Sequence, residues 1–141
     1  MAEGLLKKML SKKGVEEYNK YKIISAGTHT VEGYPPAYMT QKVMAEQGID
    51  VSSYRSNMLT RETVNKSDIV VLVMTQQHKD EVSRIVPEKI ENIFLLKEFA
   101  EIKDKNLDVS DPIGLSYDAY KYCAEEIGKC LREVIKKIEK Q

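Results

Sequence analysis

Apolar positions along this chain alternate between helical and strand-like patterns. A helical period predicts helices over residues 2–12, 37–47 and 76–86. Short apolar runs predict strands over residues 21–25, 69–74 and 93–96. The middle run has six apolar residues without alternation, which is typical of a strand buried on both faces of a parallel sheet. The resulting order of helices and strands predicts a doubly wound α/β domain.

A long amphipathic helix is predicted at the carboxyl end, over residues 116–140. Its apolar residues recur at alternating spacings of four and three: Tyr120, Ala124, Ile127, Leu131, Val134 and Ile138. These positions form one continuous stripe, which we expect to pack on the sheet. Tyr120 is therefore predicted to be a core residue.

Composition limits the classes of partner. The chain has 141 residues, a length that fits one compact domain. Its 22 basic and 22 acidic side chains cancel, which argues against nucleic acid or an anionic membrane as the main partner. No apolar stretch is long enough to span a bilayer, and no secretion signal is apparent. We therefore expect a cytoplasmic protein.

Two cysteines, Cys123 and Cys130, fall on the predicted carboxyl-terminal helix. Seven positions at 1.5 Å each place them roughly 10 Å apart along the axis. A disulfide needs Cα atoms within about 7 Å, so these two cannot pair within that helix. We interpret them as small, half-buried residues of a reducing compartment. His29 and His78 have no carboxylate or thiol at ligand spacing, so no metal site is predicted.

The dipeptide Asp111-Pro112 carries the strongest chemical signal. An aspartate before proline is held extended, so its carboxylate can project from a loop with little freedom. Such a carboxylate beside a helix start suits a general acid that protonates a leaving group. The alternative is that Asp108, Ser110 and Asp111 only form turns before the helix.

Several segments together resemble the low-molecular-weight protein-tyrosine phosphatase family. They are residues 1–5, 25–28 and 67–71, then Met74 and His78, and finally residues 111–114 with Tyr120. The resemblance covers nearly the whole chain, in the family's order. It implies a single domain over residues 1–141 with a three-layer, flavodoxin-like parallel sheet. It also implies a hydrolase that needs no metal or other cofactor.

In that family a cysteine thiolate in a phosphate-binding loop before the first helix attacks phosphorus, and an aspartate protonates the leaving group. By match, Asp111 takes the acid and later the base role. No cysteine precedes Cys123, so the nucleophile, its loop and the first central strand are missing from this chain. Burying about five apolar residues contributes roughly 8–15 kcal/mol, comparable with the whole stability of a domain, about 5–15 kcal/mol. We expect the chain to be N-terminally truncated, inactive and poorly stable.

The resemblance leaves the substrate open between phosphotyrosine and phosphoarginine on a protein, with inorganic phosphate as the product. The pair Ile113-Gly114 and residues 75–79 and 96–99 look closest to the protein-arginine phosphatase subgroup. An aromatic residue at the position of Ile113 would stack on a phosphotyrosine ring. Candidate substrate-binding residues are Thr30, in the loop of residues 28–33, together with Ile113 and Tyr117.

Two other functions remain open at this stage. One is a non-catalytic relative, or a fragment, that binds a partner through the face carrying Asp111. The other is the related arsenate reductase branch, which needs two further cysteines in a segment before the Asp-Pro loop. Both cysteines of this chain follow that loop, which disfavours the reductase.

Overall fold

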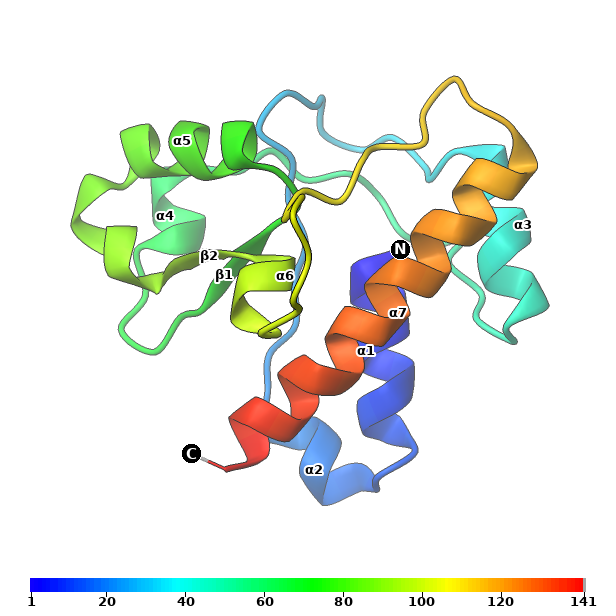
Figure 1. Cartoon of the computed structure of the whole chain (residues 1–141), viewed down its shortest axis with the longest axis horizontal. Helices are drawn as coiled ribbons and strands as arrows, with labels where there is room; N and C mark the ends of the chain where they lie inside the picture. The colour runs from blue at the N-terminus through cyan, green and yellow to red at the C-terminus, as the bar shows by residue number, and fades with distance from the viewer. Residues whose placement is uncertain (141) are drawn as a thin grey trace.

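The computed structural model describes residues 1–140 as a mixed α/β protein (Figure 1). The elements are α1 (Ala2–Ser11), α2 (Val15–Asn19), α3 (Tyr38–Glu46), α4 (Arg61–Val64), β1 (Val71–Val73), α5 (Gln76–Ile85), the 3-10 helix η1 (Pro87–Asn92), β2 (Ile93–Leu95), α6 (Leu96–Phe99) and α7 (Tyr117–Glu139). The predicted helices over residues 2–12, 37–47, 76–86 and 116–140 are confirmed to within two residues at each end.

Strands β1 and β2 form a parallel pair, in which Val71 aligns with Ile93 and Val73 with Leu95. The crossover between them contains α5, which begins where the Thr75 hydroxyl accepts a hydrogen bond from the His78 amide at 3.2 Å. Both predicted strands are therefore confirmed, although each is shorter than its apolar run. Because the two strands are parallel, their carboxyl ends lie at the same edge of the sheet.

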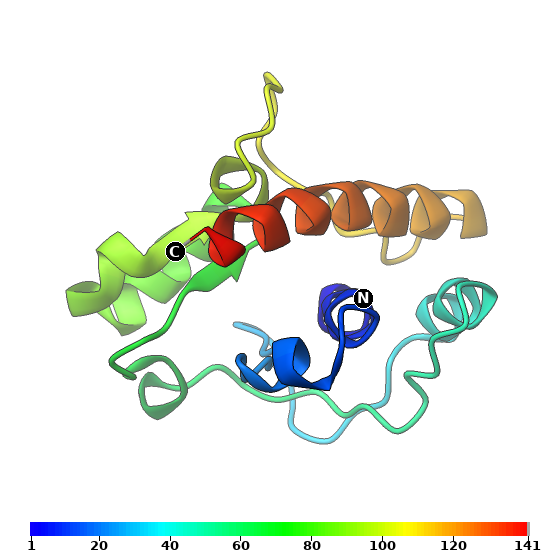
Figure 2. The same ribbon diagram turned by 90° about the horizontal axis from the view of Figure 1, so that it is seen from below.

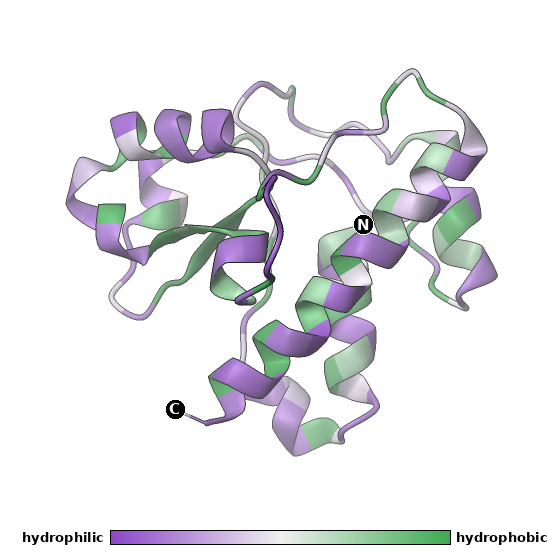
Figure 3. Ribbon diagram, in the orientation of Figure 1, coloured by the Kyte–Doolittle hydropathy of each residue, from purple (hydrophilic) through white to green (hydrophobic). Residues whose placement is uncertain are grey.

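Helix α7 carries most of the core. Its predicted stripe is buried from Tyr120, 6% exposed, to Val134, 3% exposed, whereas Ile138 near the end of the helix is half-buried. We expected this stripe to pack mainly on the sheet, and that expectation was wrong. Helix α7 packs chiefly on α1 and α3, with α6 beside it (Figure 2). The sheet reaches the same cluster only through Leu72 and Phe94. Figure 3 shows apolar colouring where α1 and α7 face each other and along both strands.

The predicted strand over residues 21–25 is not formed, which corrects the sequence interpretation. Its residues have no regular secondary structure, and Ile24 is 52% exposed. A strand is stable only when a neighbour accepts its backbone hydrogen bonds. Only Gly27, just beyond it, forms an isolated parallel bridge, to Met58.

Strand β1 is also less buried than its sequence predicted. Within residues 1–140 it pairs with β2 on one edge and with no strand on the other. Val70, immediately before it, is 49% exposed, and Val71 is half-buried. The six-residue apolar run is therefore that of a central strand, whereas the observed strand stands at an edge.

Three helices of four or five residues, α2, α4 and α6, were not predicted. Helices this short have no apolar period to detect, and tertiary contacts hold them. Helix α6 follows β2 without a break and buries Leu96, Lys97 and Phe99. None of the helices within residues 1–140 is long and apolar enough to cross a membrane.

Replacing Leu131 by alanine should lower the free energy of unfolding by about 2–5 kcal/mol, because it leaves a cavity between α7 and its neighbours. The matched substitution Leu115→Ala, at a side chain 60% exposed, should change it by less than about 0.5 kcal/mol. Urea unfolding followed by circular dichroism measures both values. Similar losses in the two variants would contradict the assigned core.

Candidate functional site

The segment of residues 107–116 is fixed to the carboxyl end of β1. The Val109 amide donates to the Met74 carbonyl at 2.7 Å, directly after the strand. The Asp108 carboxylate accepts from the Gln76 amide at 2.9 Å, at the first residue of α5. This carboxylate also lies where the helix dipole favours a negative charge. The segment therefore lies at the sheet edge where ligands of open α/β sheets bind.

Asp111 presents its carboxylate from a tight turn. Its Oδ1 accepts from the Ile113 amide at 3.0 Å, and the Leu115 amide donates to the Pro112 carbonyl at 2.9 Å. Gly114 permits the turn because its φ is 77°. Within residues 1–140, Oδ2 of Asp111 has no hydrogen bond, so one oxygen is held by the turn while the other makes no such contact.

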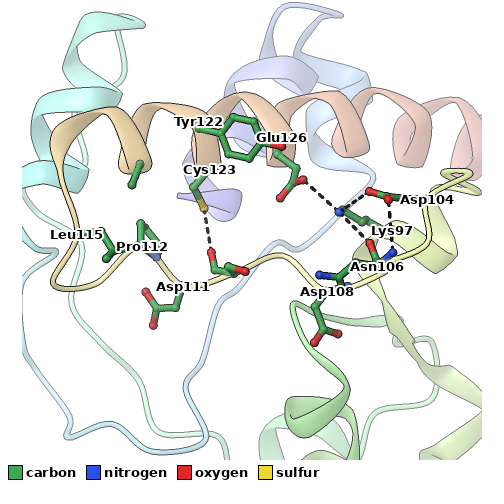
Figure 4. Close-up of a pocket in the computed structure, with 12 residues that line it drawn as sticks. Lys97, Asp104, Asn106, Asp108, Asp111, Pro112, Leu115, Tyr122, Cys123 and Glu126 are labelled. Carbon is green, nitrogen blue, oxygen red and sulfur yellow. Dashed lines mark hydrogen bonds and ion pairs between the residues drawn. The ribbon is translucent and has the colours of Figure 1, made fainter.

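The two faces of this segment differ in character. Figure 4 shows the carboxylates of Asp108 and Asp111 directed away from α7. Between the segment and α7 lies a partly open cavity of about 310 Å³, whose lining includes Lys97, Glu126 and Cys123 together with Asp108 and Asp111 of the segment itself. Pro112 is buried, whereas Asp111 is exposed. The segment thus forms one wall of this cavity while its two carboxylates point away from α7 (Figure 4).

Thr30 lies on a second loop, which Glu81 of α5 holds in place. Glu81 Oε1 lies 2.9 Å from His29 Nε2 and accepts from Gln77 Nε2 at 3.2 Å. Hydrogen bonding from the Thr28 side chain, followed by that from His29, lowers the pKa of Glu81 to about 2. A Cβ at Gly27 would come within 2.9 Å of Thr30, so the loop also needs glycine there.

The predicted substrate-binding residues occupy different surroundings. Ile113 adjoins Asp111 and is 72% exposed. Tyr117 turns towards α3, where its hydroxyl donates to Glu46 and its ring lies 4.6 Å from Lys42 Nζ. The Glu46 carboxylate raises the pKa of Tyr117 to about 12. Within residues 1–140 no hydrogen bond joins Thr30 to Asp111, so their joint role stays a prediction.

Neither cysteine has the surroundings of a nucleophile. Cys123 and Cys130 are free and buried on α7. Burial raises the pKa of both thiols, and the Glu126 carboxylate adds to this shift. A reactive cysteine requires the opposite, an accessible thiolate with a lowered pKa. The interpretation of both as packing residues is consistent with this geometry.

Two charged residues of the site escaped the sequence interpretation. Glu81 meets His29 across 52 positions, and a separation of that length leaves no local signal. Lys97 is 4% exposed although lysine is almost never fully buried without a partner. Its position between the apolar run of residues 93–96 and the apolar pair Phe99-Ala100 was the one available signal, since a charge buried there needs compensation.

Comparison with known proteins agrees with this geometry. The model of the family described as low molecular weight phosphotyrosine protein phosphatase matches residues 1–141. A probable low molecular weight protein-tyrosine-phosphatase, EpsP, from Ralstonia nicotianae is 33% identical over 127 residues, which are 90% of this chain and 78% of EpsP. A protein-arginine-phosphatase from Bacillus subtilis is 29% identical over 99% of this chain and 88% of its own.

Solved structures support the same fold. The YwlE arginine phosphatase, in a mutant with a phosphorylated active-site serine, superposes with a TM-score of 0.87 at 28% identity. The match covers 99% of this chain and 87% of that one. Similarity also extends to Arsenate reductase 2 from Staphylococcus saprophyticus, 27% identical over 94% of this chain and 83% of the reductase. The predicted three-layer α/β fold is confirmed.

The lowered pKa of Glu81 predicts a pH dependence of stability. A carboxyl whose pKa falls on folding stabilises the protein fully above its unfolded pKa, near 4.5, and loses that contribution as the pH falls towards about 2. Glu81→Gln lacks this contribution. The difference in the free energy of unfolding between Glu81→Gln and the parent chain should therefore shrink as the pH falls over this range. Chemical unfolding at pH 6, 4 and 2.5 measures it. Glu125→Gln, at an exposed position of α7, should show no such trend, and a pH-independent deficit in Glu81→Gln would refute the assignment.

Proposed function

The chain belongs to the low molecular weight phosphotyrosine protein phosphatase family, and on that premise we propose that it carries the general acid of a phosphatase acting on phosphotyrosine or phosphoarginine. The observation that supports this most directly is the placement of Asp111. Its carboxylate is exposed beyond the carboxyl end of β1, with one oxygen held by the Ile113 amide. Phosphorylated proteins are the proposed substrates and inorganic phosphate is the product.

Asp111 acts in both halves of the proposed reaction. In the first, the phosphorus–oxygen or phosphorus–nitrogen bond of the substrate breaks, a sulfur–phosphorus bond forms, and Asp111 gives its proton to the leaving atom. In the second, water attacks phosphorus, the sulfur–phosphorus bond breaks, and Asp111 takes a proton from the water. The fixed turn suits this exchange because the carboxylate keeps one position while its charge changes.

The thiolate that attacks phosphorus is proposed to be neither Cys123 nor Cys130. Both thiols are buried and their pKa values are raised. The open edge of β1 and the irregular backbone of residues 21–26 support the view that a further strand and its loop complete the site. These 141 residues alone are therefore proposed to be inactive, as a non-catalytic relative would also be.

The choice of substrate depends on the wall beside Asp111. Ile113 is exposed there and offers an aliphatic side chain instead of an aromatic ring. Ring stacking contributes about 0.5–1.5 kcal/mol, so its loss weakens phosphotyrosine binding without abolishing it. Thr30 and Tyr117 are proposed as further contacts, and Tyr117 would first have to leave Glu46. Two free thiols suit a cytoplasmic site of action.

Hydrolysis of p-nitrophenyl phosphate tests the assignment of the nucleophile. We expect no activity above background from this chain, and activity from a version extended upstream in frame. The reason is that a phosphoryl acceptor is needed and no suitable thiolate lies within these residues. Activity in the short chain would refute the assignment, and the double variant Cys123→Ser, Cys130→Ser would then locate the thiol.

Asp111→Asn in an active, extended form should lower kcat by about 10²–10⁴, the usual contribution of a general acid. The inhibition constant for inorganic phosphate should change little, since Asp111 does not hold the phosphoryl oxygens. Asp118→Asn, an exposed aspartate in the first turn of α7, is the matched control and should retain full activity. Equal turnover in Asp111→Asn would remove Asp111 from the mechanism.

A further inference from the structure

Lys97 is a buried cation with partners on both sides of the cavity between α7 and the segment of residues 107–116, which we call the acid segment. Its Nζ lies 3.0 Å from Asp104 Oδ2 and 3.1 Å from Glu126 Oε2, and it donates to the Asn106 carbonyl at 3.1 Å. All three donor positions of the ammonium group are therefore used. Figure 4 shows this network between the loop and α7. Lys97 thus joins α6, the loop of residues 103–107 and α7.

The charges of this network compensate one another. Burial alone lowers the pKa of Lys97, but Asp104 and Glu126 outweigh it and the net shift is upward. Lys97 in turn lowers the pKa of Asp104. Lys97 is 4% exposed in its side chain, whereas Asp104 is 43% exposed. Removing the cation would leave the loop with no buried attachment at this point.

A chain of side-chain turns leads from this cation to the acid. The Asn106 amide donates to Asp104 Oδ1 at 3.4 Å, and the Asp108 amide donates to Asn106 Oδ1 at 3.0 Å. Asp108 then holds the Gln76 amide, and Val109 holds Met74. Asp111 follows two residues later. Each turn fixes the backbone before the next, so the attachment at Lys97 limits the freedom of the whole segment.

We infer that Lys97 is a positioning residue for Asp111: its ammonium group fixes the loop of residues 103–107 to α7 and thereby holds Asp111 at the edge of the sheet. This inference rests on the proposed role of Asp111 as general acid. Lys97 is not proposed to contact the substrate: its nitrogen lies between the loop and α7, whereas the Asp111 carboxylate points away from α7 (Figure 4).

Cys123 offers a test that needs no catalysis. Its sulfur lies 3.7 Å from the Ser110 carbonyl, under the segment, and it is 6% exposed. Cys130, 2% exposed on the same helix, lies outside the lining of this cavity. Local opening of the segment should expose only Cys123, whereas global unfolding exposes both. Cys130 therefore reports global unfolding. Burial raises the pKa of the Cys130 thiol and the Lys97 charge lowers it in part, so Asp104→Asn, which keeps that charge, gives the cleaner ratio.

In Lys97→Met, alkylation of Cys123 by iodoacetamide should become about tenfold faster relative to Cys130, as expected for local opening. Asp104→Asn should also raise the alkylation rate of Cys123 relative to Cys130. If Lys97→Met does not fold, Asp104→Asn alone tests the inference. Lys136→Met, which removes an exposed pair with Glu133 on α7, is the control and should change neither rate. Peptide mass spectrometry measures both cysteines. An unchanged ratio, or equal acceleration of the two, would overturn the inference.

A second measurement separates positioning from mere stability. In an active, extended form, Lys97→Met should lower kcat more for phenyl phosphate than for p-nitrophenyl phosphate, because the poorer leaving group depends more on the acid. KM should change little. In an Asp111→Asn background, Lys97→Met should lower kcat by the same factor for both substrates, because the acid that it positions is absent. Equal losses for both substrates would overturn the positioning role. An inactive parent would refute the proposed function instead, and the alkylation result would stand independently.

Discussion

Burial of one face of α7 is the interaction on which the rest of this structure depends. The sheet has two strands of three residues each, and a pair that short has little stability of its own. Helix α7 supplies what the sheet lacks, since its stripe joins α1, α3 and α6 in one core. The same helix lies against the acid segment, where the Cys123 sulfur is 3.7 Å from the Ser110 carbonyl oxygen. Packing of α7 therefore sets the position of the chemistry as well as the stability.

The sequence predicted those elements whose signal is local. Helix α7 could be predicted from a stripe of six apolar residues at helical spacing; the caps at Ser116 and Thr75 are seen in the structure. The prediction of a strand over residues 21–25 was wrong because an apolar run indicates burial. It does not show that a neighbouring strand is present to accept the backbone hydrogen bonds. The packing of α7 on α1 instead of on the sheet could not be predicted either. The spacing of apolar residues identifies the buried face of a helix but not the element that covers it.

The same distinction applies to the site. Asp111 could be proposed from the sequence because Pro112 restricts its backbone and because the family resemblance includes it. The contacts that hold the two loops could not be predicted: Glu81 contacts His29 beside Thr30, and Glu126 contacts Lys97 behind the segment of Asp111. A charged pair of this kind becomes visible only when folding brings the partners together. The lysine within an apolar run was a partial exception, because burial of an unpaired ammonium group is too costly to persist.

The division between the two faces of the acid segment has a chemical reason. A general acid must change its charge during turnover, whereas a structural ion pair must keep its charge. If both shared one environment, each protonation of Asp111 would weaken the network that positions it. Here the backbone of residues 108–112 separates them, with Asp111 exposed on one face and Lys97 buried behind the other. If Asp111 has the proposed role, the ion pairs that hold the loop are thus set apart from the exposed carboxylate that would exchange the proton (Figure 4).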